Sequence, residues 1–120
     1  MELFADGVSL GRDWMSPTTY VIPRDTRVIS VEGIDKGSFF GILGSFSNGM
    51  VTDASWKCIP RIKYPGWNSP DFDDSNWPAA VERANQGDKP FGEIPGIAWT
   101  AKWIWSAGQP DLVYCRLRLQ

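Results

Sequence analysis

One stretch of this sequence, residues 53–77, limits what the chain can fold into more than any other. It holds three of the seven tryptophans and one of the two cysteines. Trp56 and Cys58 alternate with Lys57, which predicts a short strand with one buried face. Regular structure is then excluded by four turn formers, Pro60, Pro65, Gly66 and Pro70. A loop of this length is stable only when its aromatic residues bury themselves against a preformed body, so we expect a β-rich scaffold beneath it.

The end of this stretch, F-D-D-S-N-W at 72–77, predicts a tight turn. Short polar side chains in its middle bond nearby backbone amides in such turns. We expect Phe72 and Trp77 to point inward as anchors.

Short strands joined by turns are predicted along the rest of the chain. Asp6-Gly7 and Asn48-Gly49 are typical of hairpin turns. Strand-like patterns cover 18–22, 27–32, 38–47 and 113–119, the third as a central strand buried on both sides. Residues 78–84 fit either one helical turn or a strand. The last strand is expected to turn three side chains outward, those of Tyr114, Arg116 and Arg118.

Regular turn signals without an amphipathic helix predict an all-β fold, a single-domain antiparallel β-sandwich over residues 1–120. Tryptophan is usually packed, and four of the seven lie on buried strand phases or in the 72–77 turn: Trp56, Trp77, Trp103 and Trp105. Trp14 and Trp67 lie among turn residues, and we expect both to be exposed.

Several segments resemble a known family when they are taken in order. T-D-A-S-W-K and F-D-D-S-N-W-P-A-A, with the opening F-A-D-G-V-S-L-G and the closing A-K-W-I-W and V-Y-C-R-L-R-L, are similar to galactose-binding-domain-like β-sandwiches. These jelly-roll modules are attached to glycoside hydrolases such as rhamnosidases and β-galactosidases, and occur in extracellular lectins. The resemblance spans most of the chain and implies a non-catalytic sugar binder. The motif itself is structural, so it carries the fold across better than the function.

The two cysteines allow one bridge. Cys58 and Cys115 both fall on the inward phase of a strand, and they either pair or remain two buried thiols. The extracellular setting that the resemblance implies favours the bridge.

Composition excludes several function classes. The net charge of −2, with both signs interspersed, argues against nucleic acid and against electrostatic membrane binding, and no apolar run is long enough to span a bilayer. The absence of histidine removes the Ser-His-Asp and Cys-His arrangements and the commonest metal ligand. We therefore expect no enzyme activity and no cofactor. No signal peptide precedes the first strand, so we expect either synthesis without a leader or an excised domain of an extracellular or secreted protein.

Three aspartates close together admit three interpretations. Asp71, Asp73 and Asp74 cap the turn, hold calcium, or form a glycosidase pair. Capping is favoured, because neighbouring carboxylates in a turn diverge, whereas a glycosidase needs two that face each other across a cleft.

Two loops place an aromatic ring beside polar groups, as a sugar site requires. Residues Arg12, Asp13 and Trp14 form the first, and Arg61, Tyr64, Trp67 and Asn68 the second. The leading hypothesis is a carbohydrate-binding module or small lectin that recognises a sugar or glycoprotein glycan through these loops. A lectin of this kind gains avidity either as a homo-oligomer or by repetition of its site. The alternatives are a protein-interaction or extracellular matrix domain that docks through Trp14 and Trp67, and a ligandless accessory domain of a glycoside hydrolase.

Overall fold

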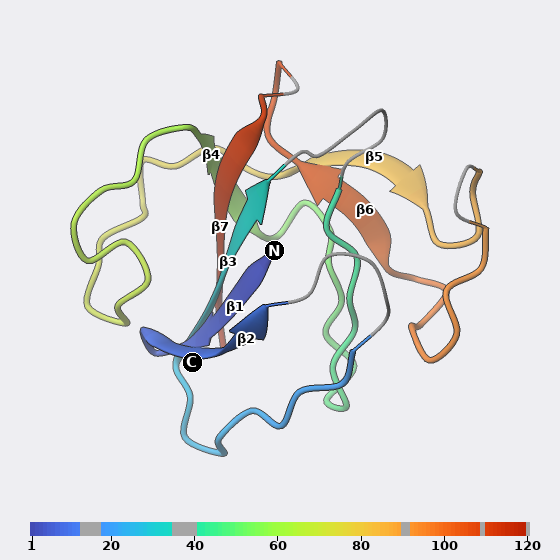
Figure 1. Cartoon of the computed structure of the whole chain (residues 1–120), viewed down its shortest axis with the longest axis horizontal. Coiled ribbons are helices and arrows are strands. Elements are labelled where there is room, and N and C mark those ends of the chain that lie inside the picture. The colour runs from blue at the N-terminus through green and yellow to red at the C-terminus, as the bar shows by residue number, and fades with distance from the viewer. Residues whose placement is uncertain (13–17, 35–40, 90–91, 109, 120) are drawn as a thin grey trace.

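The computed structural model describes residues 1–12, 18–34, 41–89, 92–108 and 110–119, and the regular structure in these ranges is β. Seven strands follow along the chain: β1 (Glu2–Ala5), β2 (Val8–Arg12), β3 (Val28–Ile34), β4 (Lys57–Pro60), β5 (Val81–Asn85), β6 (Lys102–Trp105) and β7 (Leu112–Arg118). Five of them form one antiparallel sheet in the order β2-β1-β3-β7-β4, and β5 pairs with β6 in a second (Figure 1). The prediction of an all-β, antiparallel fold is confirmed. Within the described ranges, no helix has the length and apolar character needed to cross a bilayer.

The first hairpin forms where Asp6-Gly7 predicts it. Both residues have positive φ, 47° and 85°, as a tight hairpin turn requires. The Asp6 carboxylate also accepts the backbone amides of Arg27 and Val28, each at 2.9 Å. One aspartate therefore shapes the turn and ties it to the start of β3.

Strand β7 lies inside the sheet, between β3 and β4, and its two faces bury different residues. Val113, Cys115 and Leu117 join the main core cluster. That cluster reaches the second sheet through Ile104 and Trp105 of β6. Tyr114 lies on the opposite face, in a second cluster with two tryptophans of the 61–77 segment. The sheet is thus covered on both sides.

This burial corrects one expectation about the last strand. Tyr114 and Arg116 do alternate away from the main core, as the pattern predicts, but they are buried instead of facing solvent. The 61–77 segment covers that face of the sheet. Arg118, at the strand end, is exposed as expected.

Three of the four tryptophans assigned to the core are buried, Trp56, Trp77 and Trp105. Trp103 is half-buried. The indole N–H groups of Trp56 and Trp105 donate to the carbonyls of Val51 and Pro110 at 3.1 and 2.8 Å. Their polar atoms therefore stay bonded inside the core.

Cys58 and Cys115 form a disulfide. They are direct partners in the β4–β7 register, with Cα atoms 4.1 Å apart, and both are fully buried. A bridge that closes a loop of this separation, 57 residues, stabilises a domain by roughly 2–4 kcal/mol. It fastens the edge strand β4 to the strand that organises both faces.

The chain departs from the predicted strands in two places. Residues 18–22 form no strand, and the Tyr20 ring instead packs against Gly11 of β2. The described part of 38–47 forms only isolated bridges, Ile42 with Ile104 and Ser45 with Val51, so it is not a central strand. Residues 35–40 lie outside the described ranges.

Two other predictions are settled by the backbone. The Asn48-Gly49 turn is confirmed, since Phe46 accepts from Gly49 and donates to Met50, and Gly49 has a φ of 92°. In the 78–84 segment the strand alternative is correct, because β5 begins at Val81.

Candidate functional site

Residues 61–77 form a long irregular segment over the outer face of the five-stranded sheet, which we call the clamped loop. Trp67 anchors it. Its ring packs edge-on against Tyr114 of β7, at 4.9 Å between centroids, and against Phe4 of β1, at 5.6 Å. Only 3% of Trp67 is exposed, so the expectation of an exposed, ligand-binding Trp67 is wrong. The sheet offers this ring an apolar face that the local sequence does not show.

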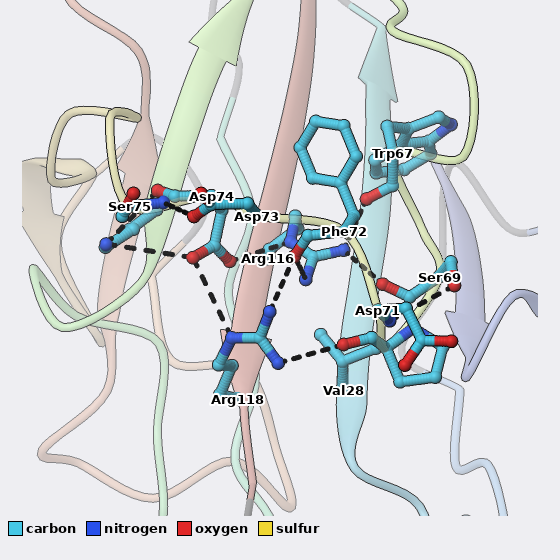
Figure 2. Close-up of polar contacts among 12 residues, drawn as sticks. Val28, Trp67, Ser69, Asp71, Phe72, Asp73, Asp74, Ser75, Arg116 and Arg118 are labelled. Atoms are coloured by element: carbon cyan, nitrogen blue, oxygen red, sulfur yellow. Dashed lines mark hydrogen bonds and ion pairs between the residues drawn. The ribbon is translucent and has the colours of Figure 1, made fainter.

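A buried arginine holds the loop backbone. Arg116 is 1% exposed, and its Nε donates to Asp74 Oδ2 at 2.7 Å. The remaining nitrogens donate to three backbone carbonyls, those of Trp67, Ser69 and Phe72 (Figure 2). The guanidinium carbon also lies 5.3 Å from the centroid of the Phe72 ring. Such a charge is tolerated inside a protein only when it is paired and fully bonded, as it is here.

Two further cations complete the arrangement around Asp74. Arg118 donates to the carbonyls of Pro70 and Phe72 at 3.1 and 2.6 Å, and its Nε lies 3.8 Å from Asp74 Oδ1. Lys57 Nζ lies 3.7 Å from the same oxygen. Asp74 is therefore a neutralised structural anion at the centre of three positive groups.

The three aspartates behave as turn and ion-pair residues. Asp73 Oδ1 accepts the backbone amide of Ser75 at 2.9 Å, and the Ser75 hydroxyl is the main cause of the lowered pKa of Asp73. Asp71 lies 3.7 Å from Arg27. In the described part of the chain, no group of three acidic or cysteine ligands could hold a metal ion.

The outer side of the clamped loop carries a shallow hollow of about 260 Å³. Its lining is three aromatic rings, one aliphatic side chain and two polar groups: Tyr64, Phe72, Trp77, Ile59, Asp73 and Asn76. Phe72 lies between the other two rings, 6.4 Å from Tyr64 and 5.5 Å from Trp77. Tyr64 is 39% exposed and is the ring most accessible to a ligand. This combination of apolar faces and planar polar groups is what a sugar ring requires.

The predicted site residues of this loop do not all converge. Tyr64 lines the hollow, whereas Arg61 points to an exposed ion pair with Asp111 at 3.2 Å. Asn68 is half-buried, near the Gly7 turn. In place of Trp67 and Asn68, the structure brings Asp73 and Asn76 to Tyr64. The sequence did not predict Asn76 as a site residue, because it lies inside the F-D-D-S-N-W motif, whose other residues are structural.

The other predicted loop is only partly described. Arg12 lies on β2 and pairs with Glu2 at 3.1 Å. Hydrogen bonding from Ser9, with a further contribution from Arg12, lowers the pKa of Glu2. Asp13 and Trp14 lie outside the described residues.

A tryptophan that the sequence pattern did not single out is the exposed one. Trp99 is 61% exposed, the largest fraction among the tryptophans that the structure describes. It stands in a turn closed by a hydrogen bond from Ala101 N to Ala98 O at 3.1 Å. The nearby Gly96 and Thr100 could have indicated this exposure. They favour a turn, and a tryptophan in a turn does not alternate with its neighbours toward a buried face as it would in a strand.

Comparison with known proteins gives one partial relative. A stretch of 55 residues is 46% identical to an α-L-rhamnosidase from Streptomyces avermitilis. The match covers 46% of this chain, and the chain spans only about 5% of that enzyme's length. No protein-family model matches the chain, and no solved structure matches it. Partial homology to a glycoside hydrolase, together with the all-β fold, is compatible with a β-sandwich module of the kind attached to such enzymes.

Proposed function

We propose that this chain is a non-catalytic accessory module of a glycoside hydrolase related to α-L-rhamnosidases, with a galactose-binding-like jelly-roll fold, and that it binds carbohydrate in the hollow of the clamped loop. The observation that carries the proposal is the 46% identity to the rhamnosidase. A match to so small a part of that enzyme supports an accessory role, which fits a small β domain.

The hollow supplies the chemistry that sugar binding needs. Tyr64 offers exposed ring surface to the C–H face of a pyranose, and Asn76 offers an amide that both donates and accepts. An aspartate of ordinary pKa is already ionised at neutral pH, and the Ser75 hydroxyl lowers the pKa of Asp73 further, so its carboxylate accepts hydrogen bonds from sugar hydroxyls. At about 260 Å³ the hollow falls just below the roughly 300–1,000 Å³ of pockets for drug-sized ligands, a size that suits one sugar ring.

The non-catalytic part of the proposal rests on the carboxylates. Asp73 and Asp74 are neighbours, but Asp74 is buried and bonded to Arg116. Hydrolysis of a glycoside needs two carboxyl groups that flank the scissile bond. Asp74, buried beneath the clamped loop and paired with Arg116, cannot reach the bond of a glycoside bound in the hollow. We extend the proposal to a setting outside the cell, to glycans as partners, and to binding without a cofactor.

The docking alternative loses one of its two residues. A protein-interaction patch built on Trp14 and Trp67 needs both rings at the surface, and Trp67 is buried. Trp14 lies outside the described residues.

Calorimetric titration with L-rhamnose and with methyl α-L-rhamnoside tests the proposal. We expect saturable binding with a dissociation constant of about 1 mM, weakened about tenfold in Tyr64→Ala and in Asn76→Ala. Arg61→Ala is the matched control, since Arg61 is exposed on the same loop but outside the hollow. Binding of neither sugar by the folded protein, or equal weakening in the control, contradicts the proposed site. Release of nitrophenol from a nitrophenyl α-L-rhamnoside contradicts the non-catalytic role.

A further inference from the structure

We propose that the exposed Trp99 ring is a second carbohydrate site, a one-sided stacking platform for a pyranose unit within an extended glycan chain. The inference rests on the proposed carbohydrate-binding function, but it concerns a different surface. In Figure 1 the orange segment that follows β5 lies at the opposite end of the long axis from the clamped loop.

Trp99 is fixed in place by a contact at its ring edge. A Cβ atom built on Gly87 would stand 2.6 Å from Cζ3 of the indole, and 3.4 and 3.6 Å from the ring carbons on either side of it. No side chain larger than hydrogen fits beside this edge unless the ring moves, and the positive φ of Gly87, 97°, also favours glycine. One edge of the ring is therefore packed against the Gly87 turn.

A buried side chain holds the segment that carries the ring, at 92–97. Gln86 is 4% exposed and makes three hydrogen bonds to this segment. Its amide nitrogen donates to the carbonyls of Ile94 and Ile97 at 2.8 and 2.9 Å, and its oxygen accepts from Ile94 N at 2.9 Å. The turn that contains Gly87 is closed by Asp88 N, which donates to Asn85 O at 3.1 Å. A ring presented by such a segment loses little freedom when it binds.

The turn that the ring edge contacts is polar. It carries the side chains of Asn85 and Asp88 next to Gly87. Lys102 Nζ donates to Asn85 Oδ1 at 2.6 Å, and Asp88 Oδ2 accepts from Asn85 N at 2.7 Å. An exposed aromatic ring packed against a turn of this polarity fits a hydroxylated ring better than an apolar protein surface.

The platform specifies a chain and not a single sugar. An open ring surface contacts one side of a stacked sugar unit and encloses neither end of that unit. The neighbouring units of the same glycan chain can therefore extend past the ring in both directions. A single stacked unit gives little affinity by itself, and further units supply the rest. The ligand class is therefore a neutral pyranose oligosaccharide, whereas the hollow of the clamped loop accepts one ring.

Nuclear magnetic resonance of the indole N–H groups tests the platform. The Trp99 signal is identified by its loss in Trp99→Ala, a surface change that leaves the fold intact. Cellohexaose and mannohexaose are the chain probes, and methyl α-L-rhamnoside is the single-ring probe. We expect at least one hexasaccharide to shift the Trp99 signal, with affinity reduced about tenfold in Trp99→Ala and less in Trp99→Tyr, which keeps an aromatic ring.

The two sites fail separately in this experiment. Tyr64→Ala is expected to leave the hexasaccharide response of Trp99 unchanged, and Trp99→Ala to leave binding of the single-ring probe unchanged. A Trp99 signal that neither hexasaccharide moves at about 10 mM, a concentration that would detect even a weak single site, overturns the platform. If Tyr64→Ala still abolishes single-ring binding in that case, the proposed function stands and only the platform is wrong. A shift of the Trp99 signal without any binding at the hollow supports the platform and contradicts the proposed site in the hollow.

Discussion

Two irregular segments of this protein, residues 61–77 and the described residues 86–89 and 92–101, differ in where they place a tryptophan. Each lacks strands for most of its length, and each is organised by one buried polar side chain, Arg116 or Gln86. The first buries its tryptophan, with 3% of Trp67 exposed. The second displays its tryptophan, with 61% of Trp99 exposed.

The difference comes from what lies beneath each segment. The clamped loop lies on a sheet face that presents Phe4, Ile59 and Tyr114, so an indole that lands there removes its area from water. Trp99 contacts a turn at Gly87 with one edge of its ring, and 61% of the residue stays exposed. Whether a tryptophan in a turn-rich segment is buried or exposed is thus decided by the surface that it packs against and not by its neighbours in sequence.

Removal of the Arg116 side chain, which holds the clamped loop, is expected to give the largest loss of stability. Arg116→Met leaves Asp74 without its closest cation and removes one donor from each of three loop carbonyls. Breaking a buried ion pair from one side costs roughly 3–5 kcal/mol of unfolding free energy. Urea denaturation measures this cost, with Arg118→Met as the control. Arg118 is partly exposed, so its loss is expected to cost about 1 kcal/mol or less. Equal losses in the two variants would mean that burial of the guanidinium is not what matters.

The two tryptophans are expected to differ under the same substitution. Trp67→Leu removes ring contacts from a packed cluster, at roughly 2–4 kcal/mol, as for other large-to-small core changes. Trp99→Leu changes an exposed ring and is expected to alter stability by less than about 0.5 kcal/mol. Thermal or urea unfolding of the pair measures the contrast directly. A large loss for Trp99→Leu would show that its contact with Gly87 carries stability and would weaken the platform.

The second organiser is expected to matter less than the first because it is uncharged. Gln86→Leu removes one hydrogen bond from each of two carbonyls and one amide, at roughly 1–3 kcal/mol. Gln86→Glu keeps the acceptor but loses both donors, so it should not restore stability. Thr100→Ala, an exposed change on the same segment, is the control. Faster hydrogen exchange confined to 94–97 is the expected signature, and exchange that spreads to the clamped loop would contradict the separation of the two segments.

Alkaline pH is expected to loosen only the clamped loop, with the smallest effect. Burial, and then the neighbouring Glu32 carboxylate, raise the pKa of Tyr114 above its ordinary value. The folded state therefore holds this proton more tightly than the unfolded state. The resulting stabilisation is full below about pH 10 and is lost as the pH rises through the folded-state pKa. The urea midpoint of the wild type should fall more steeply above about pH 10 than that of Tyr114→Phe. Parallel curves would show that Tyr114 does not carry the dependence.

The sequence predicts local features of this fold well and long-range ones poorly. The Asp6-Gly7 and Asn48-Gly49 hairpins and the burial of Trp56 depend on neighbouring residues, and the structure has all of them. The position of β7 inside the sheet depends on pairings distant in sequence, and the outward phase of Arg116 therefore predicted exposure where a loop covers it.

The candidate site shows the same division. Tyr64 was predicted from its turn-rich flanks and does line the hollow. Asn76 and Trp99 were missed, because the first depends on how the turn is presented and the second on a glycine twelve residues earlier. The side chains that these segments expose depend on the packing beneath them, which no local sequence pattern records.

The clamp has a consequence for how this protein could diversify. Apart from Asp74, both β7 arginines grip the loop through carbonyl oxygens, those of Trp67, Ser69, Pro70 and Phe72. A carbonyl is the same whatever side chain its residue carries. Replacements at Tyr64 and Asn76, which the arginines do not contact, would therefore leave the grip intact while changing the surface. Strand β7 is therefore a constant scaffold for a loop whose exposed residues can change, by evolution or by library selection.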